Sequence, residues 1–92
     1  MQRGYQGTFQ RVAGVIERPL GEATFLVDPR RNAIHQLNGV GAAVWAALAS
    51  PSSFDELAGA LRSAFPGAAP GAIEADLREL LEDLLDAQLI AR

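Results

Sequence analysis

The residues of this sequence that could take part in chemistry are few. Cysteine is absent, which excludes disulfides, thiolate metal sites and cysteine nucleophiles. His35 is the only histidine, so any site that needs two imidazoles is excluded, and a partly buried strand histidine is a simpler interpretation of it than a ligand or a base. No Ser, His and Asp grouping has the context of a nucleophile. We therefore expect a protein that is not an enzyme, with no cofactor and no metal ion.

Acidic pairs and a short glycine motif were the other candidates for chemistry. Asp76 with Glu79, and Glu82 with Asp83, have spacings that a metal site or an acid–base pair could use. They fall on the polar side of a predicted helix, and a solvated face is the simpler interpretation. The Gly-Val-Gly motif at 39–41 lacks the third glycine of a dinucleotide site, so phosphate binding is not indicated. These glycines instead allow a helix to begin close to a sheet.

Length and composition predict one small domain over residues 1–92. The chain has 49% hydrophobic and 21% charged residues, which is ordinary globular usage. Its net charge of -3 argues against general affinity for nucleic acid or anionic membranes. The apolar run Gly39 to Ala49 would span only about 16 Å as a helix, against roughly 30 Å for a bilayer core. No secretory signal is present at the start, so we expect a cytoplasmic location and no membrane partner.

The first half of the chain has the pattern of strands. Short β-compatible runs occupy Val12 to Ile16, Ala23 to Val27 and Ala33 to Leu37. Between them, Arg18 to Gly21 and Asp28 to Asn32 carry proline, glycine, aspartate and asparagine, which are turn residues. The sequence therefore predicts three antiparallel strands in two hairpins.

After Asn38 the apolar residues repeat with helical spacing, and helices are predicted over about 39–49, 53–65 and 72–89. Asn38 can cap the first helix, and Ser53 with Glu56 forms a capping box for the second. The apolar stripe of the third helix covers an arc of roughly 140°, wider than one packing partner needs. That stripe comprises Ile73, Leu77, Leu80, Leu81, Leu84 and Leu85. The fold class is therefore α+β, with a three-stranded antiparallel sheet followed by three helices.

The third predicted strand has an unprotected edge. Edge strands are commonly blunted by lysine or proline, but the chain contains no lysine, and no proline lies within Ala33 to Leu37. We expect this edge to be available for an added strand.

Besides the binding of an added strand, two classes of function are compatible with these elements. The last two helices and the hairpin imitate a winged helix-turn-helix, and a transcription-related DNA-binding protein is one alternative. Against it, the helix that would enter the major groove has a charge of -5, because six carboxylates oppose Arg78 alone: Glu74, Asp76, Glu79, Glu82, Asp83 and Asp86. A dimerisation or adaptor module is the other alternative, since a free strand edge can pair with its own copy.

Several segments together resemble the PqqD-like family, small peptide chaperones also described as recognition elements for ribosomally synthesised and modified peptides (RiPPs). The segments are Leu37-Asn38, an alanine-rich helix with Val44-Trp45 and Leu48, the run SFDELAGALRSAF, and an acidic leucine helix that ends LLDAQLI. The resemblance runs from about Val12 to Ile90. It departs at residues 50–52, where Ser-Pro-Ser replaces the usual acidic-glycine turn.

The resemblance implies three antiparallel strands and three helices in a winged helix-turn-helix arrangement. It also implies binding of the leader segment of a precursor peptide as a strand added between the third strand and the third helix. The leader is then presented to a modifying enzyme, such as a radical SAM protein or a leader protease. The pathway is pyrroloquinoline quinone biosynthesis or that of another modified peptide. We expect a monomer or weak homodimer that binds no nucleic acid.

Site residues follow from the resemblance together with strand alternation. Backbone contacts to the peptide are expected along the third strand, at Ala33, Ile34, His35, Gln36 and Leu37. Leu37 is a core position in the family, so His35 is expected to point inward and Ile34 outward. Leu77, Leu81 and Leu85 are expected to form the wall of an apolar groove, with a place in the core as the alternative. Arg30 and Arg31 are expected either to attract an acidic leader or a partner enzyme, or simply to keep a turn soluble.

Overall fold

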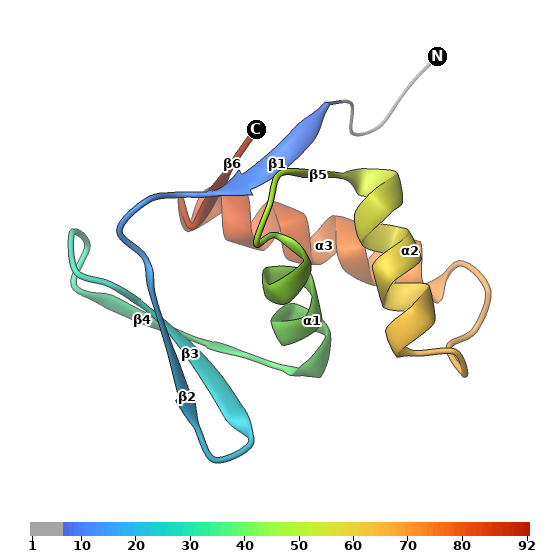
Figure 1. Cartoon of the computed structure of the whole chain (residues 1–92), viewed down its shortest axis with the longest axis horizontal. Helices are drawn as coiled ribbons and strands as arrows, with labels where there is room; N and C mark the ends of the chain where they lie inside the picture. The colour runs from blue at the N-terminus through green and yellow to red at the C-terminus, as the bar shows by residue number, and fades with distance from the viewer. Residues whose placement is uncertain (1–6) are drawn as a thin grey trace.

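The structure is a computed structural model, and it describes residues 7–92. Within this range the chain forms two small antiparallel sheets and three helices (Figure 1). The larger sheet has the order β2-β3-β4, from Ile16–Leu20, Ala23–Asp28 and Ala33–Leu37. The helices are α1 (Gly39–Ala47), α2 (Phe54–Ala64) and α3 (Ala72–Asp86). The predicted α+β architecture of a three-stranded antiparallel sheet with three helices is confirmed.

The first strand of this sheet lies later in the chain than predicted. Residues 12–15 form a connection, and β2 begins at Ile16, so the prediction of a strand over 12–16 is wrong. Pro19, predicted to lie in a turn, is inside β2 opposite Thr24. An edge strand tolerates proline because half of its N–H groups have no partner in the ladder. The turn is shifted to residues 21–22, where Gly21 adopts a φ of 62° and begins a two-residue hairpin loop.

The predicted turn between β3 and β4 is confirmed, and Asp28 organises it. The backbone N–H of Arg30 donates to Oδ1 of Asp28 at 3.1 Å, and that of Arg31 donates to the Asp28 carbonyl at 3.3 Å. Asn32 takes the left-handed conformation, with a φ of 53°, that brings the chain back into β4. Such local side-chain bonding is the reason that aspartate and asparagine are frequent in turns.

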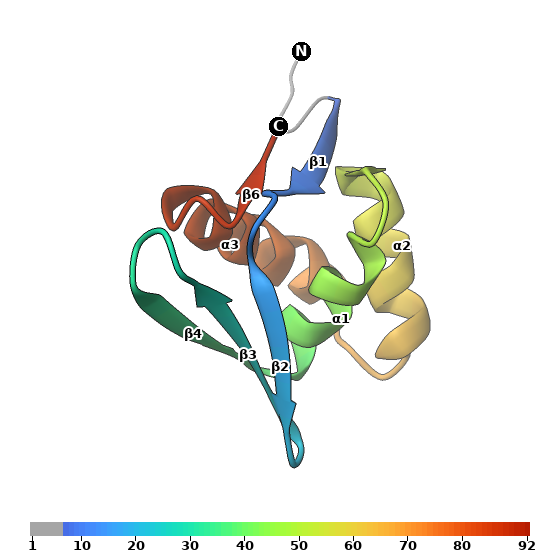
Figure 2. The same ribbon diagram turned by 60° about the vertical axis from the view of Figure 1, so that its left-hand side comes forward.

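A second sheet was not predicted. Its central strand is β1 (Thr8–Arg11), which pairs with β5 (Ser52–Ser53) on one side and β6 (Ile90–Ala91) on the other. Figure 2 shows β1 and β6 side by side. Phe9 is fully buried, and the Arg11 side chain donates to the Trp45 carbonyl while its guanidinium lies 4.6 Å from the indole ring. β1 and β6, at the two ends of the described chain, are thus held against the helices.

The helix starts are as predicted from their caps. Oδ1 of Asn38 accepts from the Gly41 N–H at 2.7 Å, and Ser53 and Glu56 form the reciprocal capping box, at 3.1 and 2.8 Å. A Cβ on Gly41 would lie 3.3 Å from Leu37, so this glycine, and not Gly39, allows α1 to begin against β4.

The third helix ends earlier than predicted, at Asp86 instead of 89. Gln88 takes the left-handed conformation with a φ of 59°, and the N–H of Leu89 donates to the Leu84 carbonyl at 3.0 Å. These are the marks of a Schellman C-cap. No helix in the described part of the chain is both long and apolar enough to cross a membrane.

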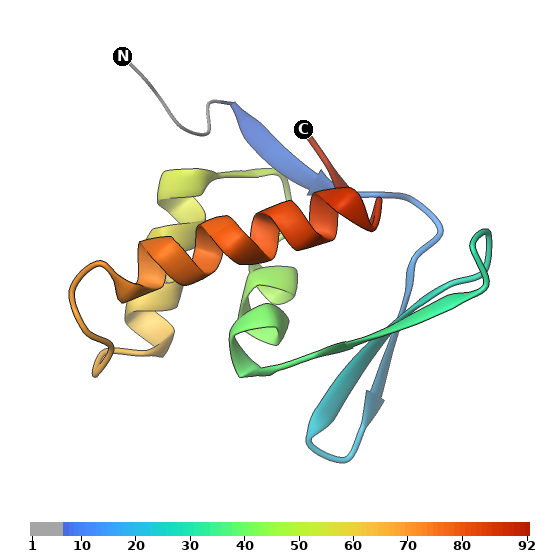
Figure 3. The ribbon, with the colours of Figure 1, turned by 180° about the vertical axis from the view of Figure 1, so that it is seen from behind.

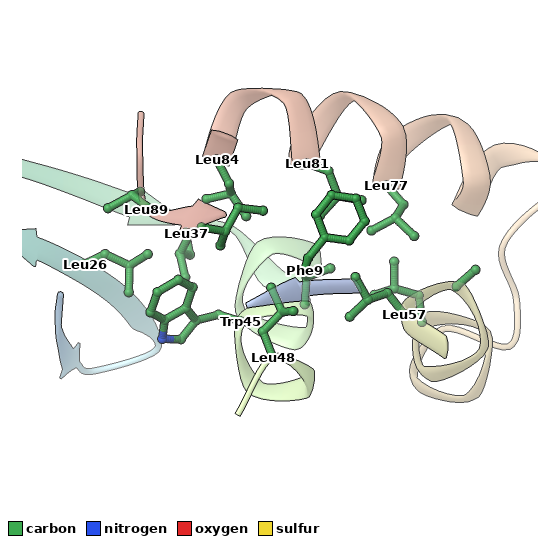
Figure 4. Close-up of a cluster of buried hydrophobic side chains, with 14 residues drawn as sticks. Phe9, Leu26, Leu37, Trp45, Leu48, Leu57, Leu77, Leu81, Leu84 and Leu89 are labelled. Atoms are coloured by element: carbon green, nitrogen blue, oxygen red, sulfur yellow. The ribbon is translucent and has the colours of Figure 1, made fainter. Parts of the chain in front are cut away.

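The core lies where α3 crosses the other elements. Figure 4 shows Leu77, Leu81 and Leu84 pointing from α3 toward side chains of β1, α1 and α2. The fully or almost fully buried residues include Phe9, Leu26, Val44, Trp45, Leu48, Leu57, Leu61, Leu77, Leu81, Leu84 and Leu89. At roughly 1.5–3 kcal/mol for each large apolar side chain removed from water, this cluster is the main stabilising feature of the fold.

Candidate functional site

β4 is an edge strand. It pairs with β3 on one side only, in the register Leu26↔His35 and Val27↔Ile34. Its side chains alternate as predicted: Leu37 is buried, His35 is half-buried on the same face, and Ile34 is 70% exposed on the opposite face. The main-chain groups along the other edge of β4 pair with no strand among residues 7–92.

This free edge borders a cavity of about 250 Å³ between β4 and α3, which we call the β4–α3 groove. Figure 3 shows the two elements from the side on which α3 lies in front. The β4 side is lined by His35, Gln36, Leu37, Asn38 and Gly41, and the α3 side by Leu80, Asp83, Leu84, Ala87 and Leu89. The leucines and the glycine of this lining are buried or partly buried, whereas Gln36, Asn38 and Asp83 are exposed, so the groove has an apolar floor and a polar rim.

The groove continues along α3 toward the start of that helix. A second cavity of about 240 Å³ shares Asn38, Leu80 and Asp83 with the first, and adds Val40, Asp76 and Glu79. Beyond it, Val40 and Asp76 also border an apolar hollow of about 150 Å³ next to Phe65 of the α2–α3 connection. Because they share residues, the cavities make one elongated depression with α3 as a wall along its length. From here on, the β4–α3 groove means this whole depression.

The leucines predicted to form this wall are placed differently. Leu77 and Leu81 are 0% exposed and belong to the core, and Leu85 is half-buried against the core outside the groove. Leu80 and Leu84 line the groove instead. The apolar arc of α3 is wide because it includes residues that line this cavity as well as residues of the core. The sequence did not show which flank of the arc faces β4, because that depends on the rotation of α3 about its axis.

Arg30 and Arg31 are engaged with a buried carboxylate. Their Nε atoms lie 3.5 and 3.9 Å from the two oxygens of Asp28, a residue with no exposed surface. Arg31 also donates to the side chain of Gln88, which ties the β3–β4 turn to the C-cap of α3. Both arginine side chains remain about half exposed, so attraction of a charged partner stays a prediction, while their role in the turn is evident.

Apart from Glu74, which pairs with Arg62, the acidic side chains on α3 divide into two groups that the sequence alone does not separate. Asp76, Glu79 and Asp83 line the groove, whereas Glu82 and Asp86 are exposed and line none of its cavities. Among the described residues, no three histidine or acidic side chains converge closely enough to hold a metal ion. The site is thus an open strand edge above an apolar floor with an acidic wall, an arrangement suited to an extended peptide.

Comparison with known proteins bears on the family and on the fold. The model of the family described as "Coenzyme PQQ synthesis protein D (PqqD)" matches residues 23–90. A solved structure described as "TbiB1 in Complex with the TbiA(beta) Leader Peptide" superposes with a TM-score of 0.77 at 20% sequence identity. The match covers 88% of this chain and 93% of that one, which shows the same fold over nearly the whole length. No curated protein matches the sequence.

Proposed function

The chain belongs to the PqqD family, and from this premise we propose that it is a non-catalytic chaperone for a ribosomally synthesised precursor peptide. The leader segment of that peptide binds as a strand added to β4 and is presented there to a modifying enzyme. One observation carries the proposal: the unpaired edge of β4 borders the β4–α3 groove. A protein of the same fold has been solved with a leader peptide, which supports this function.

Strand addition uses the two features that the site combines. The free N–H and C=O groups of β4 provide main-chain hydrogen bonds whatever the peptide sequence, and the groove selects among side chains. Because strand side chains alternate, every second residue of the leader points into the groove, over Leu80 and Leu84. The residues between them point to the outer face of the sheet, beside Ile34.

That outer face is a surface for the modifying enzyme. It is apolar and uncovered in the described chain: Ile34 and Leu20 are 70% and 67% exposed, and they share a shallow hollow with Phe25 and Val27. A leader strand on β4 extends this face, so an enzyme that docks on it meets the leader at its margin. This continuity through β4 is why we assign the face to the enzyme.

The proposal also covers the pathway, the cellular location and the oligomeric state. The pathway is pyrroloquinoline quinone biosynthesis or the maturation of another modified peptide, and the genes next to this one would distinguish a radical SAM enzyme from a leader protease. The step takes place in the cytoplasm, where ribosomes make the precursor. The protein acts as a monomer or a weak homodimer, which ultracentrifugation over a concentration series would test.

The test is an NMR titration with the leader of a precursor peptide encoded beside the gene, with a scrambled leader as the control. We expect the largest amide shifts in residues 33–37 and 80–89. Leu80→Asp should weaken this binding, whereas Leu20→Asp should leave leader affinity unchanged and reduce modification by the partner enzyme. Shifts confined to β2 and β3, or equal binding of the scrambled peptide, would show that the groove is not the leader site.

A further inference from the structure

The wall that α3 presents to the groove carries charge of one sign. Asp76, Glu79 and Asp83 are three and four residues apart, a spacing that places them along one face of a helix. Asp83 borders both of the connected cavities, and Asp76 and Glu79 border the one that runs beside Asn38 and Val40. A bound strand that continues from the edge of β4 past Asn38 therefore passes Asp83 first and then the other two carboxylates.

These carboxylates have no partner within the described chain. The ion pairs within residues 7–92 join Asp28 to Arg30 and Arg31, and Glu74 to Arg62. Asp76, Glu79 and Asp83 belong to none of them. Arg78, the basic residue of α3, lies over the ring of Phe54.

On the opposite wall, His35 lines the cavity that Asp83 also lines, and the cavity that Asp76 and Glu79 border has no basic residue in its lining. Among residues 7–92, therefore, no ion pair neutralises the acidic wall, and its attraction is available to a ligand.

The spacing of the carboxylates matches that of strand side chains. From Asp76 to Asp83 the helix rises about 10 Å, at roughly 1.5 Å per residue. Side chains on one face of a strand recur about every 6.7 Å, at roughly 3.3 Å per residue. Two long basic side chains placed two or four residues apart on a bound strand can therefore both reach this wall. Their aliphatic stems would cover the apolar floor while the charged ends stay at the rim.

We propose that the leader recognised by this protein is basic: it carries lysine or arginine at positions two or four residues apart, on the face turned toward α3. This inference rests on the proposed function, since it concerns the ligand of the same groove. The carboxylates select against acidic segments by repulsion, which gives the groove a specificity that main-chain pairing lacks.

The first test is a selection of random 12-residue peptides displayed on yeast, followed by NMR mapping of the peptides obtained. We expect those that shift residues 33–37 and α3 to be enriched in lysine or arginine at the predicted spacing. Groove-binding peptides without that enrichment would overturn the inference and leave the proposed function standing. If no selected peptide maps to the groove, both fail.

The second test uses two double variants with the same change in charge on the same helix. Glu79→Gln with Asp83→Asn alters the wall, and Glu82→Gln with Asp86→Asn alters the side that lines none of its cavities. The wall variant should weaken a selected basic peptide about fivefold at low salt, at roughly 1.5- to 5-fold for each exposed ion pair, and the control less than twofold.

Two further measurements complete this test. High salt should remove the difference between the two variants, because it screens exposed charges. A peptide with norleucine in place of lysine should be insensitive to the wall variant. Equal loss of affinity in both variants would show a diffuse effect of net charge and overturn the assignment to the wall. Thermal unfolding of each variant verifies that it is folded.

Discussion

Leu80 and Leu81 are neighbours in sequence, and truncation of each to alanine tests the rotation of α3. Leu81 is 0% exposed and points into the core, whereas Leu80 is half-buried and lines the groove. The two substitutions remove the same atoms from the same helix, and helix propensity changes equally. Any difference between them therefore reports the surroundings of the two side chains.

The magnitudes follow from burial. Leu81→Ala leaves a cavity in a closely packed core and should cost about 2–5 kcal/mol. Leu80→Ala removes three carbons that are mostly but not fully buried, which should cost about 1–2 kcal/mol at roughly 0.8 kcal/mol per buried methylene. For a domain of this size 1 kcal/mol corresponds to about 4–8 °C in Tm, so we expect losses of roughly 8–40 °C for Leu81→Ala and roughly 4–16 °C for Leu80→Ala.

The assay is thermal and urea unfolding followed by circular dichroism, paired with leader binding for each variant below its Tm. Leu80→Ala should bind the leader more weakly, and Leu81→Ala should keep its affinity once the unfolded fraction is taken into account. Equal destabilisation by the two substitutions would refute the rotation of α3 described above. For the same reason Leu81→Asp, which would be well tolerated if Leu81 lined the groove, is expected to unfold the domain.

Two further predictions concern the backbone, and both are measured by urea unfolding. Gly59→Ala, at an open position of α2, should stabilise the protein by about 0.4–1 kcal/mol. Gly41→Ala should destabilise it, because the new Cβ would lie 3.3 Å from Leu37 and from Asn38 Oδ1. A gain in stability at both glycines would contradict the close approach of α1 to β4. Gln88→Gly should stabilise by roughly 0.5 kcal/mol, since glycine adopts the left-handed C-cap conformation without strain; a clear loss would mean that the contact with Arg31 outweighs the strain.

The helices could be predicted closely from the sequence because their signals are local. Asn38 and Ser53 bond to residues three positions away, and these bonds fix where α1 and α2 begin. The small sheet could not be predicted, since β1 pairs with residues about 45 and 80 positions further along the chain. Nothing in its four residues indicates those partners. The end of α3 was misplaced because Gln88 occupies a left-handed position in which glycine is the usual signal.

The orientation of the β4 side chains could be predicted from the sequence, and that of the α3 leucines could not. Alternation along a strand has a period of two, so one core residue, Leu37, fixes the orientation of His35 and Ile34. On α3 the apolar arc is wide enough for more than one rotation of the helix. In the rotation that α3 adopts, Leu81 is buried and Leu80 faces the groove. Leu81 shares the core with Phe9, which belongs to a strand that the sequence did not reveal.

The same rotation bears on the DNA-binding alternative. In a winged helix-turn-helix, the second helix of the pair enters the major groove of DNA and must approach phosphates. Here that helix is α3, and the face it does not bury carries carboxylates on both sides, Asp76 and Asp83 toward the groove and Glu82 and Asp86 away from it. The exposed surface of α3 is therefore predominantly acidic, which disfavours its approach to a phosphate backbone. On the groove side, the carboxylates that argue against DNA binding are the same ones from which we propose a basic peptide strand, so both arguments rest on one distribution of charge.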